Sequence, residues 1–383
     1  MRARDAAIFF SIVFTMYGLI NLYIFSHGSS VLAAHPELYP WYLGVFLFFS
    51  LAFIAGRFLE RVSITLLSSA LIWIGSFWLA AMAYFLLIVV AIDVLRMLNA
   101  IVPFIPTSLF TPDAKLNTLL MSVIGVAAII IGGAINARTP RIKNLNLTIP
   151  KNSHPLKSLN IVAASDIHLG TIICKARLER IVEKINSLDA DIVLLPGDVV
   201  DEDIGPVIKQ NLGETLRKIK SKHGVIAITG NHEYIGGVNA ACQYLVEHGI
   251  TMLRDDVVRI ADSFYVVGRE DVSYNRGRQR QRKPLNELMN GIDKSLPIIL
   301  MDHQPFRLHE AEENGVDLQL SGHTHHGQMF PFNYITKRIF EVSWGYKKKG
   351  NTHIYVSCGV GSWGPPVRVG NTPEIMNIKL IFA

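Results

Sequence analysis

Hydrophobic residues are distributed unevenly along the chain, and its first third contains four long stretches without a charged side chain. About 20 apolar residues suffice for a helix to cross a bilayer core of roughly 30 Å. The stretches are Ala6–Pro36, Leu38–Gly56, Val62–Ile92 and Leu116–Ala137. They predict an all-α membrane domain of four transmembrane helices in residues 1–138, the first ending near Phe25, before the polar segment Ser26–Ser30.

The pattern changes after a proline-containing linker over residues 139–157. Beyond it, short β-branched runs alternate with amphipathic segments, as expected for sheets covered by helices. The predicted strands are Asn160–Ala164, Asp191–Leu195, Val225–Thr229, Phe264–Val267, Pro297–Met301, Leu318–Ser321, His353–Ser357 and Ile375–Ile381. The predicted helices are Lys175–Ser187, Val207–Lys220, Val238–His248, Leu285–Asn290 and Arg307–Asn314. This succession predicts an α/β domain over residues 158–383.

Composition supports this division of the chain. Overall 50% of the residues are hydrophobic and 18% are charged, but residues 1–150 hold only 9 Lys+Arg and 5 Asp+Glu, against 28 and 26 in the remainder. A uniform soluble globule and a disordered chain are both excluded. The three cysteines form no CxxC pair, so neither a disulfide framework nor a cysteine zinc site is expected.

Positive charges beside the apolar stretches predict the orientation. If the N-terminus is inside, seven Lys and Arg residues flank the stretches on the inside, against Arg96 and Lys115 outside. Because cytoplasmic flanks collect positive charge, both ends are predicted in the cytoplasm, as in a multi-pass protein of the cell inner membrane. Asp93 and Arg96, near the end of the third stretch, are expected to pair there.

Residues that bind metals recur directly after five predicted strands, where open α/β sheets build their sites. The motifs are S-D-I-H-L-G (Asp166, His168), P-G-D-V-V-D (Asp198, Asp201), T-G-N-H-E (Asn231, His232, Glu233), M-D-H-Q-P (His303) and S-G-H-T-H-H-G (His323, His325, His326). One such motif is weak evidence, but five in register are strong. Their imidazole, carboxylate and amide groups exceed what one tetrahedral ion needs, which indicates two divalent metal ions with Asp198 as a bridge.

The set of motifs resembles the calcineurin-like metallophosphoesterase superfamily over roughly residues 158–383. The resemblance implies a four-layer αββα sandwich with a dimetal site at one edge, holding Mn²⁺ foremost, or Zn²⁺, Fe²⁺ or Ni²⁺. It implies these metal ligands: Asp166, His168 and His325 for the first ion, Asn231, His303 and His323 for the second, and Asp198 bridging both. It makes His232 the catalytic histidine and Asp201 the carboxylate that orients it.

One departure from the superfamily narrows the substrate. In its protein phosphatases an arginine follows the second aspartate of G-D-x-x-D and grips a phosphomonoester, whereas here Glu202 follows Asp201. A phosphodiester or pyrophosphate is therefore expected. The run C-G-V-G-S-W-G-P-P-V-R-V-G is similar to a membrane-associated bacterial branch, which includes enzymes that cleave UDP-2,3-diacylglucosamine. The leading hypothesis is hydrolysis of a lipid-linked substrate at the cytoplasmic face of the bilayer.

Two alternatives stay open: the same chemistry on a soluble (cyclic) nucleotide or other diester, and a metal-binding membrane sensor or transporter without catalysis. Met329–Phe340 mixes aromatic residues with Lys337 and Arg338, which is typical of a headgroup-level interface, an apolar substrate lip or a covering loop. Arg276–Lys283 carries five positive charges and is interpreted as a solvated loop, with anionic lipid or a nucleotide phosphate as alternative partners. Nucleic acid is not an expected partner.

Overall fold

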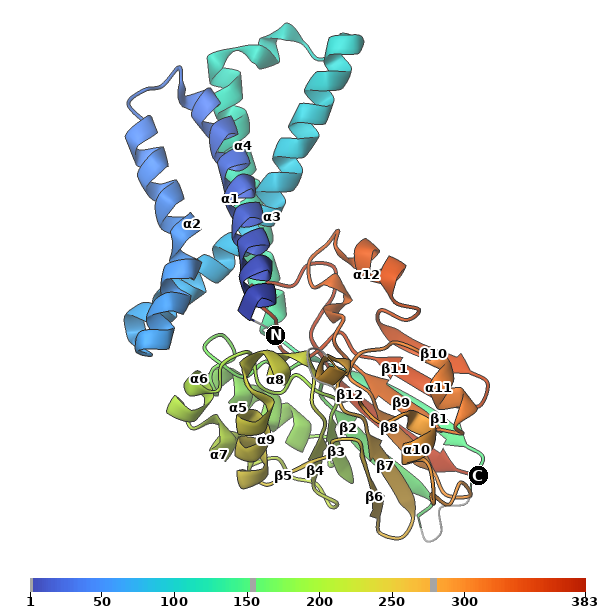
Figure 1. Ribbon diagram of the computed structural model, residues 1–383. Coiled ribbons are helices and arrows are strands. Elements are labelled where there is room, and N and C mark those ends of the chain that lie inside the picture. Colours follow the sequence, from blue (N-terminus) through green and yellow to red (C-terminus); the bar gives the residue numbers. More distant parts are fainter. Residues whose placement is uncertain (1–2, 152–155, 276–280) are drawn as a thin grey trace. The chain divides into compact units, whose positions relative to one another are not determined.

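The computed structural model describes residues 3–151, 156–275 and 281–383. The chain folds into two compact units, each described by itself (Figure 1). The helical unit comprises Met1–Ala134 with Gly364–Val367, and the second unit comprises Ile135–Trp363 with Arg368–Ala383.

The helical unit contains α1 (Ala3–Leu32), α2 (Tyr39–Val62), α3 (Leu66–Ile101), the short η1 (Thr107–Phe110) and α4 (Pro112–Ala137). Within the described residues, α2, α3 and α4 are long and apolar enough to cross a membrane, with 24, 36 and 26 residues. The sequence predicted four such helices, and the structure supports three. The first predicted span is helical and forms α1. The side chains of residues 3–7, 9 and 10 in this helix lie outside the described part.

The predicted end of the first helix near Phe25 is wrong, because α1 continues to Leu32. Serine hydroxyls in this polar turn donate to helix carbonyls one turn earlier: Ser26 Oγ to Tyr23 O at 2.8 Å and Ser30 Oγ to His27 O at 2.8 Å. Polar side chains satisfied in this way do not end a helix.

The second unit contains two six-stranded sheets. The first runs β1 (Arg141–Ile149), β12 (Glu374–Phe382), β2 (Ser158–Ala163), β3 (Ile192–Leu195), β4 (Val225–Ala227), β5 (Ile250–Met252). The second runs β10 (Gly345–Lys349), β11 (Thr352–Val356), β9 (Leu318–Ser321), β8 (Ile298–Met301), β7 (Phe264–Gly268), β6 (Asp256–Ile260). The helices are α5 (Lys175–Asn186), α6 (Gly205–Lys209), α7 (Leu212–Leu216), α8 (Asn231–Gly236), α9 (Val238–Glu247), α10 (Leu285–Leu288), α11 (His309–Glu313) and α12 (Asn333–Ile339).

The sheets pack face to face over one hydrophobic core, with Ile161 and Leu194 from the first sheet against Val266 and Ile299 from the second. Helices cover the outer faces on opposite sides, α5, α7 and α9 on one and α10 and α11 on the other (Figure 1). Strands such as β3, β8 and β9 are buried along their whole length, which explains their continuous apolar sequences. The predicted αββα sandwich is confirmed.

All eight predicted strands are present, with ends shifted by at most two residues. The predicted helix Val207–Lys220 is instead split into α6 and α7, because Asn211 between them adopts a left-handed conformation with φ 53°. The sequence reading missed β1, β5, β6 and β10. Strand β1 lies inside the segment expected to be a linker and pairs in parallel with β12 over nine residues.

Candidate metal centre

The five motifs follow the carboxyl ends of β2, β3 and β4 in the first sheet and of β8 and β9 in the second. Within each set the strands are parallel neighbours. Parallel neighbours direct their carboxyl ends to the same edge of a sheet, so the loops converge although the motifs are far apart in sequence. The structure brings together all seven residues predicted as metal ligands.

The first group consists of Asp166, His168 and His325, whose candidate ligand atoms lie within 4.8 Å of one another. The Nε2 atoms of His168 and His325 are 3.0 Å apart, and His325 Nε2 is 3.4 Å from Asp166 Oδ1. All three residues are buried. Three donors facing a common point in this way fit one divalent cation.

The second group consists of Asp198, His303 and His323, again within 4.8 Å. His303 Nε2 lies 3.1 Å from Asp198 Oδ2, and the same oxygen is 3.9 Å from Nε2 of His168 in the first group. The Oδ1 of Asn231 is 2.7 Å from Nδ1 of His323. Asp198 therefore lies between the two groups, where a bridging carboxylate is expected.

The backbone around these ligands is tightly constrained. Asp166, His168 and Asp198 adopt positive φ angles of 53°, 54° and 52°, which are uncommon for residues other than glycine. A Cβ on Gly230 would lie 2.1 Å from Asp198 Oδ1, and one on Gly322 would lie 2.2 Å from Asp166 Oδ2. The glycines of the motifs thus let two loops approach the carboxylates closely.

The contacts of His303 indicate whether the donor set suits cations. Its Nδ1 lies 2.8 Å from the carbonyl oxygen of Pro196, which can only accept, so Nδ1 carries the proton. In a neutral ring, Nε2 is then an acceptor 3.1 Å from the Asp198 carboxylate, so either a second proton on the ring or a bound cation has to balance the contact. Burial lowers the pKa of His303, but the charge of Asp198 outweighs this effect and raises the pKa well above its usual range. In addition, Asp166 Oδ2 is buried without a hydrogen-bond partner among the described residues.

Comparisons with known proteins agree with this geometry. The model of the calcineurin-like phosphoesterase family matches residues 159–327. An uncharacterized metallophosphoesterase of Aquifex aeolicus is 30% identical over 256 residues, 66% of this chain and 97% of its own length. The chain belongs to the calcineurin-like metallophosphoesterase family.

Two further metallophosphoesterase relatives are longer than the region they share with this chain. An uncharacterized metallophosphoesterase of Helicobacter pylori (strain J99) is 36% identical over 244 residues, 63% of this chain and 64% of that protein. A transmembrane protein with metallophosphoesterase domain of Danio rerio is 30% identical over 273 residues, 68% of this chain and 62% of that protein. The chain thus spans slightly less than two thirds of the length of these two relatives.

The predicted pair of His232 and Asp201 lies beside the predicted metal ligands. His232 Nδ1 is 3.0 Å from Asp201 Oδ1, and the rings of His232 and His168 meet edge to face with centroids 4.6 Å apart. Burial lowers the pKa of His232, but the hydrogen bond to Asp201 and the charges of Asp198 and Asp201 raise it to about 9. Burial raises the pKa of Asp201, yet the bonds to His168 and His232 lower it well below its usual value.

Asp201 also lies 3.5 Å from Nδ1 of His168, so one carboxylate orients both a predicted ligand and the predicted catalytic histidine. A carboxylate behind a metal-binding imidazole fixes its tautomer and raises its basicity. The sequence motif predicted only the contact with His232.

Sequence reasoning assigned no role to Glu233, although it belongs to the G-N-H-E motif. Its carboxylate accepts backbone bonds from Gly230 at 2.7 Å and Val200 at 2.9 Å, which tie the second and third motif loops together. Burial and the charge of Asp198 raise its pKa to about 7. The signal available in the sequence was its position three residues after Gly230, the spacing of a helix-capping carboxylate.

Arg368 and Asn371 were also missed. Arg368 is fully buried, donates to Gly361 O at 2.7 Å and to Asn371 Oδ1 at 3.1 Å, and lies 3.2 Å from Nδ1 of His325. Asn371 donates in turn to His325 O at 2.9 Å. These residues support the loop that carries His325. Arg368 lies in the run C-G-V-G-S-W-G-P-P-V-R-V-G, but its contacts could not be inferred from that run.

The sequence left the roles of Met329–Phe340 and Arg276–Lys283 open, and the structure describes the first segment fully and the second in part. Met329–Phe340 includes α12, which packs against η3 (His325–Gly327) and exposes several apolar side chains. Of Arg276–Lys283, residues 276–280 lie outside the described residues. Arg282, expected in a solvated loop, is instead half-buried and pairs with Asp302 at 2.9 Å, next to His303.

Proposed function

We propose that this protein is a dimetal hydrolase of phosphodiester or pyrophosphate bonds, and that its substrate is linked to a lipid. The observation that carries the hydrolase proposal is the convergence of seven imidazole, carboxylate and amide ligands around Asp198, with His232 beside them. Both ligand groups combine residues that follow strands of the first sheet with residues that follow strands of the second, so the site depends on the complete sandwich.

Two bound divalent ions would supply a nucleophile at neutral pH and stabilise the attacking and leaving oxygens. The protein's residues have distinct tasks around them. Asp198 would hold both ions. His232 lies 3.0 Å from Asp201, and this carboxylate favours the protonated form of the imidazole. It is therefore suited to protonate or stabilise the leaving oxygen. Mn²⁺ is the proposed metal, with Zn²⁺, Fe²⁺ or Ni²⁺ as alternatives, because nitrogen and oxygen ligands suit all four.

The lipid part of the proposal rests on exposed apolar side chains near the metal ligands. Phe340 lies between the site and the surface, with its ring centroid 5.9 Å from that of His323 and 4.9 Å from that of Phe306. Around it, Tyr334, Ile335 and Ile339 of α12 are between 56% and 61% exposed. We call this cluster (Phe306, Phe330, Tyr334, Ile335, Ile339) the α12 patch.

Contiguous exposed apolar surface on a soluble domain marks an interaction site. Lys337 and Arg338, in the last turn of α12, place positive charge beside the α12 patch. Apolar side chains with flanking cations suit acyl chains and anionic headgroups at a membrane interface. The patch would therefore receive the acyl part of the substrate at the bilayer surface.

We further propose that the metal centre faces the cytoplasm, at the inner membrane of the cell. Arg57 and Arg61 lie at the end of α2, and Arg138, Arg141 and Lys143 follow α4. Only Arg96 and Lys115 flank the other ends of α3 and α4. Five positive charges against two favour a cytoplasmic location for the segment after α4. This argument does not depend on whether α1 crosses the membrane.

A soluble nucleotide diester is the second candidate, favoured by Trp363. This side chain is 53% exposed, and its ring centroid is 6.0 Å from that of His232. An exposed indole beside the reacting groups could stack on a nucleobase.

The test uses full-length protein in lipid vesicles, with Mn²⁺ and a panel of lipid-linked diesters and pyrophosphates, soluble cyclic nucleotides and a simple aryl diester. The double variant Ile335→Ser/Ile339→Ser should lower kcat/KM for lipid-linked substrates about tenfold and leave the aryl diester unaffected. Val246→Ser is a matched control, because Val246 is 55% exposed on α9. Equal loss on both substrate classes would contradict the lipid part, and absence of hydrolysis across the panel would contradict the hydrolase.

A further inference from the structure

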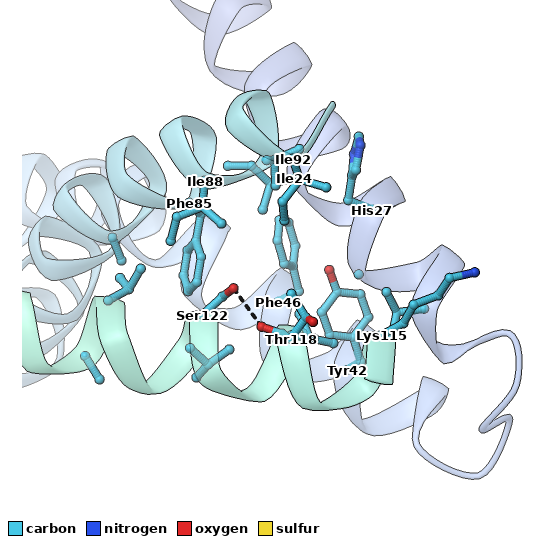
Figure 2. Close-up of a pocket in the computed structure, with 18 of the residues that line it drawn as sticks. Ile24, His27, Tyr42, Phe46, Phe85, Ile88, Ile92, Lys115, Thr118 and Ser122 are labelled. Carbon is cyan, nitrogen blue, oxygen red and sulfur yellow. Dashed lines mark hydrogen bonds between the residues drawn. The ribbon is translucent and has the colours of Figure 1, made fainter. Parts of the chain in front are cut away.

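The helical unit contains a partly open cavity of about 600 Å³ between α1, α2, α3 and α4 (Figure 2). Its wall is mainly apolar: Ile24 of α1, Phe46 of α2, and Phe85, Ile88 and Ile92 of α3 point into it. The volume lies in the range of ordinary ligand pockets, about 300–1,000 Å³. The cavity is far too large to be a packing defect, which in a close-packed interior rarely exceeds a water molecule.

One end of this cavity is polar. His27, Arg96 and Lys115 line it, at the end of the unit where α1 and α3 finish and α4 begins. Asp93 pairs with Arg96 at 3.7 Å and accepts bonds from Tyr23 at 2.5 Å and from His27 at 3.0 Å.

These contacts leave the positive charge of Lys115 uncompensated. The Asp93 carboxylate is balanced by Arg96, whereas Lys115 has no ion pair among the residues that the structure describes. In Figure 2 the Lys115 ammonium extends beyond the loop end of the cavity, away from the apolar wall. A long apolar cavity with a cationic end has the shape and charge distribution of a binding site for an acidic amphiphile.

We propose that this cavity binds one anionic phospholipid, with an acyl chain against the apolar wall and the phosphate headgroup beside Lys115 and Arg96. The site lies within the helical unit and shares no residue with the metal centre. It is therefore a lipid-binding function distinct from the proposed hydrolysis. The bound lipid would fill space that the helices alone leave unpacked, since close packing is the main force that holds helices together in a membrane.

Trp78 lines the cavity beside Phe46, which allows binding to be measured directly. Full-length protein in detergent is titrated with brominated phosphatidylglycerol or brominated phosphatidylcholine, and quenching of tryptophan fluorescence is recorded. The part of the quenching that is absent in the Trp78→Phe variant is attributed to Trp78. We expect saturable quenching by one lipid per chain, with about fivefold tighter binding of the anionic lipid. Linear quenching that is equal for both lipids would overturn the proposal.

Variants separate the two parts of the site. Lys115→Gln should remove most of the anionic preference, and Arg61→Gln, an exposed residue at the other end of the unit, should not. Ala127→Phe should abolish saturable quenching by filling the cavity, whereas Ala128→Phe, the next residue of α4 but not part of the wall, should leave it unchanged. Tight saturable binding that survives both Lys115→Gln and Ala127→Phe would place the lipid elsewhere.

Discussion

The two units each contain a cluster of interacting polar side chains, and the clusters are held in different ways. Around the metal centre the side chains come from short loops, are buried, and are fixed by backbone bonds such as His323 N to Asp166 Oδ1 at 2.8 Å. In the helical unit, His27, Asp93 and Arg96 come from regular helices, and their side chains are 23%, 39% and 44% exposed.

The difference shows what each cluster can tolerate. A metal centre needs several ligand atoms in one fixed arrangement. Here unusual backbone conformations and buried hydrogen bonds hold these atoms in place. A cluster on helix surfaces rests on i,i+3 and i,i+4 spacing, as between Asp93 and Arg96 or Tyr23 and His27, and its partners can rearrange. Substitutions should therefore have large effects in the first cluster and small ones in the second.

The largest effect is expected for Asp198→Asn. Its carboxylate lies between the two ligand groups and also accepts the backbone N–H of His232 at 2.9 Å. Loss of its charge should lower diester hydrolysis about 10⁴-fold, equivalent to about 5.5 kcal/mol. Metal analysis of the same preparation should show fewer than two ions per chain. Activity within tenfold of the parent protein would remove Asp198 from its bridging role.

The next largest effect is expected on protein stability, for the substitution Arg368→Met. Removal of the guanidinium leaves the carbonyl of Gly361 and the amide of Asn371 without their buried donor. We expect the free energy of unfolding to fall by about 2–5 kcal/mol, because each buried acceptor that loses its donor costs about 1–3 kcal/mol. Urea unfolding of the full chain, followed by near-UV circular dichroism, measures this. A fall in the free energy of unfolding below 1 kcal/mol would mean that the residues supporting the His325 loop tolerate substitution as well as those of the helical cluster.

A smaller effect is expected for His232→Asn. This change removes proton donation but keeps the metal ligands, so kcat should fall about 10²- to 10³-fold while KM and metal content stay unchanged. Asp201→Asn should reduce kcat less and narrow the pH range of activity on its alkaline side, because Asp201 helps to raise the pKa of His232. Loss of metal from His232→Asn would instead identify the histidine as a ligand.

The smallest effect is expected in the helical cluster. Arg96→Gln breaks an ion pair whose partners are 44% and 39% exposed, so stability should change by less than about 1 kcal/mol. Thermal unfolding in detergent, with Arg61→Gln as a control for the loss of one exposed charge, measures the change. If Arg96→Gln lowered stability as much as Arg368→Met, the two clusters would not differ in their tolerance of substitution.

The sequence allowed the metal centre to be predicted because each motif is local. Asp166 and His168, for example, are two residues apart after a strand whose apolar run is unmistakable. The shared direction of parallel strands then brings the loops together, and the fold requires no further information for this step.

What could not be predicted depends on contacts between distant residues. Arg368 acquires its role only because Gly361 and His325 are brought to it by folding. Strand β1 alternates apolar and polar residues only from Leu145 onward and lies between prolines, so it was mistaken for a linker. The polar end of α1 was misjudged for a similar reason, since His27 finds its partner Asp93 on another helix.

The pairing of β1 with β12 has a consequence for biosynthesis. Asn144 and Asn377 are bonded across this pair although 233 residues separate them. At a synthesis rate of about 5–20 residues per second, β1 leaves the ribosome roughly 10–50 s before its neighbour β12 has been synthesised. During that time the first strand of the sandwich lacks its partner β12, and an unpaired strand edge of this kind can pair with another molecule.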